Sequence, residues 1–90
     1  MNDTIKTLGH TKYKALELVR RHVPAGGSVL ELSCGAGVLA GAMARAGYQV
    51  RGTNYSVYPG MNPDILVDTG VDLLKPLPYA DASYDCVVLS

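Results

Sequence analysis

The spacing of apolar and polar residues predicts a first helix over residues 11–23. The apolar residues that recur at helical spacing and share one face are Ala15, Leu16, Val19 and Val23. Thr11 stands at the start of this segment and is the expected N-cap. The sequence Pro-Ala-Gly-Gly at 24–27 then ends the helix and turns the chain.

Two short strands are expected on either side of a second helix. Residues 28–32 form a mostly apolar strand that runs directly into a glycine-rich turn at 33–37. The alanine-rich segment 38–46 favours a helix, and Gly47 suits its C-terminus. Residues 48–53 alternate in polarity, as expected of a second strand.

The rest of the chain predicts two further strands joined by loops. Residues 54–63 contain Pro-Gly and Asn-Pro breakers and form a loop before a third short strand at 65–67. Prolines in the connection 68–83 limit it to at most one helical turn. The near-continuous apolar run at 85–89 is typical of a central parallel strand that is covered on both faces.

This order of elements predicts an α/β fold with a Rossmann-like parallel sheet of about four strands and flanking helices. Residues 1–27 form a helix and turn preceding the sheet, and residues 28–90 form the sheet itself. The sheet is expected to be incomplete, because no helix follows the last apolar strand to cover it. We therefore expect a longer protein, with a C-terminal half or a partner chain.

Composition excludes several classes of partner. The 90 residues are 48% hydrophobic and balance eight basic against eight acidic residues, so neither nucleic acid nor an anionic membrane is expected to bind. A basic cluster lies on the first predicted helix and fits a solvated helix face. No apolar run approaches the roughly 18–20 residues that span a bilayer. The N-terminus lacks a secretory pattern, and Cys34 and Cys86 have no metal or redox spacing, so we expect a cytoplasmic protein.

The turn at 33–37 carries the clearest chemistry. A tight turn between a parallel strand and a helix brings backbone N–H groups to the carboxyl edge of the sheet, where ligands bind in open α/β folds. Gly35 and Gly37 permit unusual backbone angles and a close approach of a ligand, although they could also simply close a tight turn. Glu31 ends the preceding strand, where a carboxylate can bond the loop amides or a cationic ligand.

The sequence over 29–37, Val-Leu-Glu-Leu-Ser-Cys-Gly-Ala-Gly, resembles the first motif of class I S-adenosylmethionine-dependent methyltransferases. That motif is usually written as two hydrophobic residues, an acid, a hydrophobic residue and G-C-G-x-G. The run at 77–89 is similar to the family's L-P-F-x-D-x-S-F-D-x-V segment, with Tyr79 and Tyr84 in place of phenylalanines. The resemblance covers residues 28–90, is nearest to the small-molecule "type 11" domains, and implies that 28–90 is the S-adenosylmethionine-binding half of a methyltransferase domain.

The resemblance implies a role for six residues. Glu31, Ser33, Gly35 and Gly37 would contact the methionine part of S-adenosylmethionine, Asn54 the ribose and Asp72 the adenine. Asp68, which directly follows the third strand, is the rival for the adenine contact. The acceptor would be a small molecule, and no catalytic residue is assigned, because the family's acceptor-binding residues usually follow the fourth strand.

Two residues depart from the family pattern. Ser33 stands where the motif has its first glycine, which is tolerable if its backbone angles are ordinary. Asn54 stands where the family has a carboxylate for the ribose hydroxyls, so we expect weaker binding, since charge-assisted hydrogen bonds are about twice as strong. An Asn54→Asp change would then strengthen cofactor binding.

Other interpretations stay open. Gly35-x-Gly37-x-x-Ala40 also fits the G-x-G-x-x-G/A fingerprint of NAD or FAD dinucleotide-binding domains. A non-catalytic, methyltransferase-like remnant is the second alternative. Tyr58 could line the acceptor side of the pocket, as could Tyr13, while His10 and His22 fit surface positions better than catalytic bases.

Overall fold

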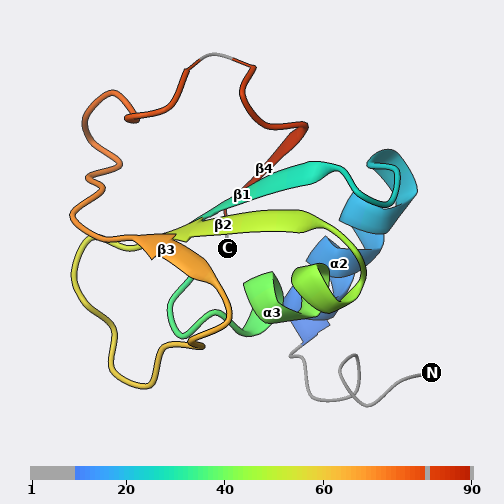
Figure 1. The fold of residues 1–90 in the computed structure, drawn as a ribbon, viewed down its shortest axis with the longest axis horizontal. Coiled ribbons are helices and arrows are strands. Elements are labelled where there is room, and N and C mark those ends of the chain that lie inside the picture. Colours follow the sequence, from blue (N-terminus) through green and yellow to red (C-terminus); the bar gives the residue numbers. More distant parts are fainter. Residues whose placement is uncertain (1–9, 81, 90) are drawn as a thin grey trace.

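The computed structural model describes residues 10–80 and 82–89 as two helices and four strands (Figure 1). In chain order the elements are α2 (His10–His22), β1 (Ser28–Leu32), α3 (Val38–Arg45), β2 (Gln49–Thr53), β3 (Leu66–Asp68) and β4 (Cys86–Leu89). All strand pairs are parallel, and the strand order is β3-β2-β1-β4. The protein therefore has an incomplete α/β Rossmann-like fold, as its sequence predicts.

The order in which the chain adds strands to the sheet reverses beside β1. From β1 the chain moves outward to β2 and β3, and it then returns to place β4 on the other side of β1. In register, Leu30 of β1 lies between Arg51 of β2 and Val87 of β4. This reversal is a topological switch point, which in open α/β sheets is where ligands bind, outside the carboxyl ends of the strands.

Both helices pack against one face of the sheet. The buried side chains that form this core are Leu16, Val19, Val23, Val29, Leu39, Ala42, Met43 and Tyr48. Val29, the second residue of β1, has no exposed surface. The Tyr48 hydroxyl donates a 2.7 Å hydrogen bond to the carbonyl of Val23, which joins the end of α2 to the start of β2. The helices therefore fix the sheet from one side and hold β1 at its centre.

Gly47 ends α3 with a left-handed backbone, φ 101°. Its N–H donates to Ala44 O at 3.0 Å, and the N–H of Tyr48 donates to Met43 O at 3.1 Å, the two bonds of a Schellman motif. The predicted C-terminus of this helix is therefore confirmed. The prediction for Thr11 is wrong, because α2 begins at His10 and Thr11 lies inside the helix.

The other face of the sheet has no helix over it among the described residues. Leu66 on β3, and Val87 and Leu89 on β4, are 68%, 54% and 70% exposed on this face. In the described part of the chain β4 is an edge strand with alternating burial. The expectation of a central strand covered on both faces is therefore wrong here, because an apolar run does not specify which strands lie beside it.

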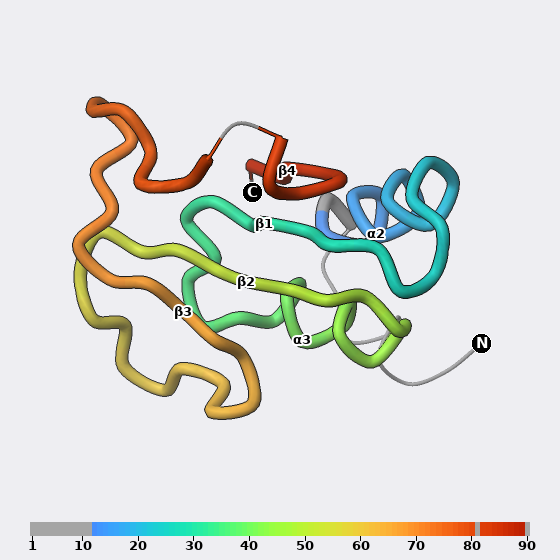
Figure 2. The backbone as a smooth tube through the Cα atoms, turned by 45° about the horizontal axis from the view of Figure 1, so that its top comes forward, coloured from blue at the N-terminus to red at the C-terminus, as the bar shows by residue number. Residues whose placement is uncertain are grey.

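The connection between β3 and β4 takes a long course outside the sheet (Figure 2). Its described residues form turns and bends with no helix, in agreement with the expected limit of one helical turn. Across residues 10–80 and 82–89, no helix has the length and apolarity needed to cross a membrane.

Candidate functional site

The glycine loop, residues 33–37, lies at the carboxyl end of β1 and leads into α3 at the switch point of the sheet. Three of its residues have left-handed backbones: Ser33 at φ 57°, Gly35 at φ 59° and Gly37 at φ 87°. Glycine adopts this conformation without strain, whereas a serine does not. The condition under which Ser33 is tolerable at this position, ordinary backbone angles, is therefore not met.

Most amide groups of the glycine loop have acceptors within the protein. The N–H of Ser33 donates to Thr53 Oγ1 at 3.3 Å, and that of Cys34 donates to Thr53 O at 2.9 Å. The N–H of Gly35 donates to Asn54 Oδ1 at 2.9 Å, and that of Gly37 donates to Cys34 O at 3.0 Å. These four amides are therefore turned toward the protein rather than arranged as a concave anion-binding nest.

Asn54 follows β2 directly and makes two reciprocal hydrogen bonds with the glycine loop. Its Oδ1 accepts from the N–H of Gly35 at 2.9 Å, and its Nδ2 donates to the carbonyl of Gly35 at 3.0 Å. The residue is only 7% exposed. Asn54 is thus at the predicted site, but half of the hydrogen-bonding capacity of its amide already holds the loop.

Residues 55–61 form a loop that returns to the glycine loop, a contact that sequence reasoning missed. At its far end the N–H of Asn62 donates to the carbonyl of Ala36 at 2.9 Å. Tyr58 lies between Asn54 and Asn62, the two residues that are hydrogen-bonded to the glycine loop. Its ring comes close to Gly35, because a Cβ built on Gly35 would lie 3.9 Å from Cε2 of Tyr58. The sequence marks Asn62-Pro63 only as a breaker, so nothing in its local pattern indicates this return.

Glu31 lies at the end of the central strand, behind the glycine loop. It is 0% exposed, so its side chain is closed off from a ligand at the surface of the loop. Burial, followed by the nearby charge of Glu31, raises the pKa of the Cys34 thiol. A Cβ at Gly52 would lie 2.6 Å from Cys34 Sγ, so a glycine is needed there for the thiol to pack. Cys34 therefore serves as a buried, protonated packing residue beneath the loop.

Asp72 lies in the connection after β3, near the end of β2. Its Oδ1 accepts a 2.9 Å hydrogen bond from the N–H of Leu74. The N–H of Val71 donates to the carbonyl of Asn54 at 3.2 Å, which brings Asp72 to the same edge of the sheet as Asn54. An open pocket of about 560 Å³ is lined there by Tyr55, Gly70, Val71, Asp72, Lys75, Pro76 and Pro78.

Asp68, the rival candidate, is held by two other side chains. Arg51 donates to both of its carboxylate oxygens at 2.9 Å, and the Tyr79 hydroxyl donates to Oδ2. The hydrogen bonds from Arg51 and then from Tyr79 lower the pKa of Asp68. Burial and the hydrogen bond to Asp68 raise the pKa of Tyr79. This pairing leaves Asp72 as the better candidate for a ligand contact.

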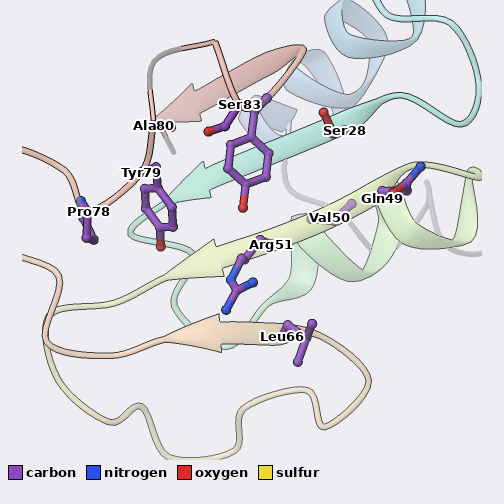
Figure 3. Close-up of a pocket in the computed structure, with 10 residues that line it drawn as sticks. Ser28, Gln49, Val50, Arg51, Leu66, Pro78, Tyr79, Ala80 and Ser83 are labelled. Atoms are coloured by element: carbon purple, nitrogen blue, oxygen red, sulfur yellow. The ribbon is translucent and has the colours of Figure 1, made fainter.

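A second open pocket, of about 570 Å³, lies over the sheet face that lacks helices (Figure 3). Its lining combines strand residues such as Arg51 and Leu66 with residues of the β3–β4 connection, including Tyr79 and Tyr84. The rings of Tyr79 and Tyr84 meet edge to face, with centroids 5.8 Å apart. This pocket contains none of the six residues predicted to bind cofactor.

Five of the six predicted residues lie in the glycine loop or at the ends of β1 and β2 next to it: Glu31, Ser33, Gly35, Gly37 and Asn54. Asp72 lies at the same edge of the sheet. Comparison with protein-family models, with curated proteins and with solved structures finds no match for this chain.

Proposed function

We propose that this chain is the cofactor-binding portion of an S-adenosylmethionine-dependent methyltransferase that acts on a small molecule in the cytoplasm. The observation that carries the proposal is the glycine loop at the carboxyl end of the central strand, beside the switch point of the sheet. Among the described residues, chain neighbours aside, only the ring of Tyr58 comes within 4 Å of the position that a Cβ would take at Gly35. Glycine at this position keeps a side chain out of the approach to the loop backbone.

The residues fit an adenosyl ligand whose small amino-acid end carries a net charge of one, positive. Gly35 and Gly37 would provide the close backbone approach for the methionine part, Asn54 a hydrogen bond to the ribose, and Asp72 an acceptor for the adenine amine. Glu31 places a buried carboxyl group beneath the loop. When bound, S-adenosylmethionine supplies a methyl group that its sulfonium makes electrophilic, and positioning against an acceptor contributes most of the catalysis.

The hydrogen bonds of the loop favour this ligand over a dinucleotide. A pyrophosphate needs several free N–H groups at the turn and the helix N-terminus. Here the amides of Ser33, Cys34, Gly35 and Gly37 already have acceptors within the protein. A neutral asparagine also replaces the acid that NAD-binding domains place after the second strand.

A cofactor-binding module without catalysis is the second candidate. Ser33 has a strained left-handed backbone, and the side-chain amide of Asn54 already makes two hydrogen bonds with Gly35. Both features weaken the ligand site relative to the family pattern. Transfer of a methyl group to a panel of small-molecule acceptors, measured together with cofactor binding, separates the two candidates.

The test of binding compares Gly35→Ala with Gly26→Ala by calorimetric titration of S-adenosylmethionine into the 90-residue protein. Both glycines have positive φ, 59° and 87°, so both changes strain the backbone. Only the methyl at Gly35 enters the ligand space, because Gly26 lies before β1 and has nothing within 4 Å of its Cβ position. We expect overpacking at Gly35 to weaken binding about 5- to 150-fold. Equal affinities for the two variants, or no binding by the wild type, would contradict the proposal.

A further inference from the structure

We propose that Tyr79 is a positioning residue of the cofactor site: its hydrogen bond to Asp68 holds one wall of the pocket beside Asp72 in the form that receives the adenosyl part of S-adenosylmethionine. This inference rests on the proposed function and deepens it. Tyr79 is not among the residues that line that pocket, so it acts through the wall and not by contact with the ligand.

Residues 76–78 form a wall between two pockets. Pro76 and Pro78 line the pocket beside Asp72, and Pro78 also lines the pocket over the sheet face without helices. All three residues of the wall are exposed, so packing does not fix them. The two prolines have no N–H with which to bond the backbone. The position of the wall therefore depends on the residues at its two ends.

Hydrogen bonds hold the wall at both ends. Before it, the N–H of Lys75 donates to the carbonyl of Asp72 at 3.1 Å. After it, the half-buried Tyr79 points from the connection toward the sheet and donates its hydroxyl to Asp68 Oδ2 (Figure 3). Because proline fixes φ, the wall cannot absorb a shift of Tyr79 by bending freely at each residue, and it moves with that end.

Asp68 is a firm anchor for this tether. Arg51 donates to both of its carboxylate oxygens at 2.9 Å, and its carbonyl accepts from the N–H of Asn54 at 2.9 Å. Asn54 is the residue proposed to bond the ribose, so the tether and the ribose contact meet at neighbouring strand ends. Without the tether the wall is in place in only a fraction of the molecules, and the apparent affinity for the ligand falls by that fraction.

The experiment titrates S-adenosylmethionine and S-adenosylhomocysteine into the wild type, Tyr79→Phe and Tyr84→Phe by calorimetry, with folding checked by circular dichroism. We expect Tyr79→Phe to weaken both ligands by the same factor, about 3- to 10-fold, because both carry the adenosyl part. Tyr84 meets Tyr79 edge to face, but its hydroxyl is not bonded to Asp68. Tyr84→Phe is therefore the matched control and should keep the wild-type affinities.

A double-mutant cycle shows whether Tyr79 acts through Asp68. Asp68→Ala removes the acceptor, so Tyr79→Phe added to it should weaken binding no further. A purely structural contribution of the two residues would lower the free energy of unfolding and leave the affinities of the folded variants unchanged.

The outcomes separate this inference from the proposed function. Binding of neither ligand to the wild type would contradict the proposed function, and this inference with it. Unchanged affinity in Tyr79→Phe, an equal loss in Tyr84→Phe, or additive losses in the cycle would overturn the role of Tyr79 alone. Where a variant does not fold, amide hydrogen exchange of the wild type decides: residues 75–80 should exchange more slowly with S-adenosylmethionine bound, and an unchanged rate would overturn the inference.

Discussion

At Ser33 a side chain stands on a backbone that favours glycine. Its φ of 57° is left-handed, which costs an L-residue about 1–2 kcal/mol. The glycine of the family motif removes that strain but loses more conformational entropy on folding, about 0.5–1 kcal/mol. We expect Ser33→Gly to raise the free energy of unfolding by about 0.5–1 kcal/mol, as measured by urea denaturation.

Ala82 provides the matched control for Ser33. It has the same φ of 57° but lies in the β3–β4 connection, outside the six predicted binding residues. Ala82→Gly should stabilise the fold by a similar amount, while only Ser33→Gly also improves binding of S-adenosylmethionine. A loss of stability in Ser33→Gly would mean that the contacts of the serine hydroxyl outweigh the backbone strain.

Between elements, the Asn54–Gly35 pair joins the loop after β1 to the end of β2. Asn54→Asp keeps the acceptor for the N–H of Gly35 but turns an oxygen toward its carbonyl, where Nδ2 now donates. At a site only 7% exposed, we expect a loss of about 1–3 kcal/mol in the free energy of unfolding, read from urea denaturation. The added charge therefore lowers the stability of the fold, and this loss opposes any gain in hydrogen bonding to the ribose.

Asn62→Asp is the control for this change. Asn62 Oδ1 accepts from the N–H of Asp64 at 2.9 Å, and an aspartate keeps that bond. Its unfolding free energy should therefore change much less than that of Asn54→Asp. Equal losses in the two variants would show that the added charge, and not the broken pair with Gly35, is responsible.

The sequence predicts the elements well because each follows from local pattern. Every predicted helix and strand agrees with the structure to within one residue at either end, including β1 at Ser28–Leu32. The position of the glycine loop follows as well, since a turn after a parallel strand lies at the carboxyl edge.

Contacts between distant segments are not encoded in local pattern. The pairing of Asn54 with Gly35 and the return of Tyr58 depend on tertiary structure, as does the position of β4 at the edge of the described sheet. A polarity pattern reports which side chains become buried, but it does not report which partners bury them. For the same reason the sequence does not decide between Asp68 and Asp72, whereas the structure pairs Asp68 with Arg51.

For the whole molecule, the β3–β4 connection is fastened to the sheet at two places. Tyr79 donates to Asp68, which also pairs with Arg51, and Asp85 Oδ2 accepts from the N–H of Ser28 at 2.9 Å. Together these bonds fix the connection across the face that lacks helices among the described residues. Because a domain this small unfolds cooperatively, loosening either end should lower the stability of the whole fold.

The Asp68 cluster therefore predicts how global stability depends on pH. The folded pKa of Asp68 is lowered, so its contribution is fully present above the unfolded value of about 3.9 and is lost as pH falls through the folded value. The pKa of Tyr79 is raised, so its contribution is present below about 10 and is lost at higher pH. Urea midpoints across pH should fall at both ends for the wild type. Asp68→Asn should be less stable at neutral pH and lose less in acid, while Tyr79→Phe should lose less in alkali. Parallel profiles for all three proteins would mean that the cluster does not hold the connection in solution.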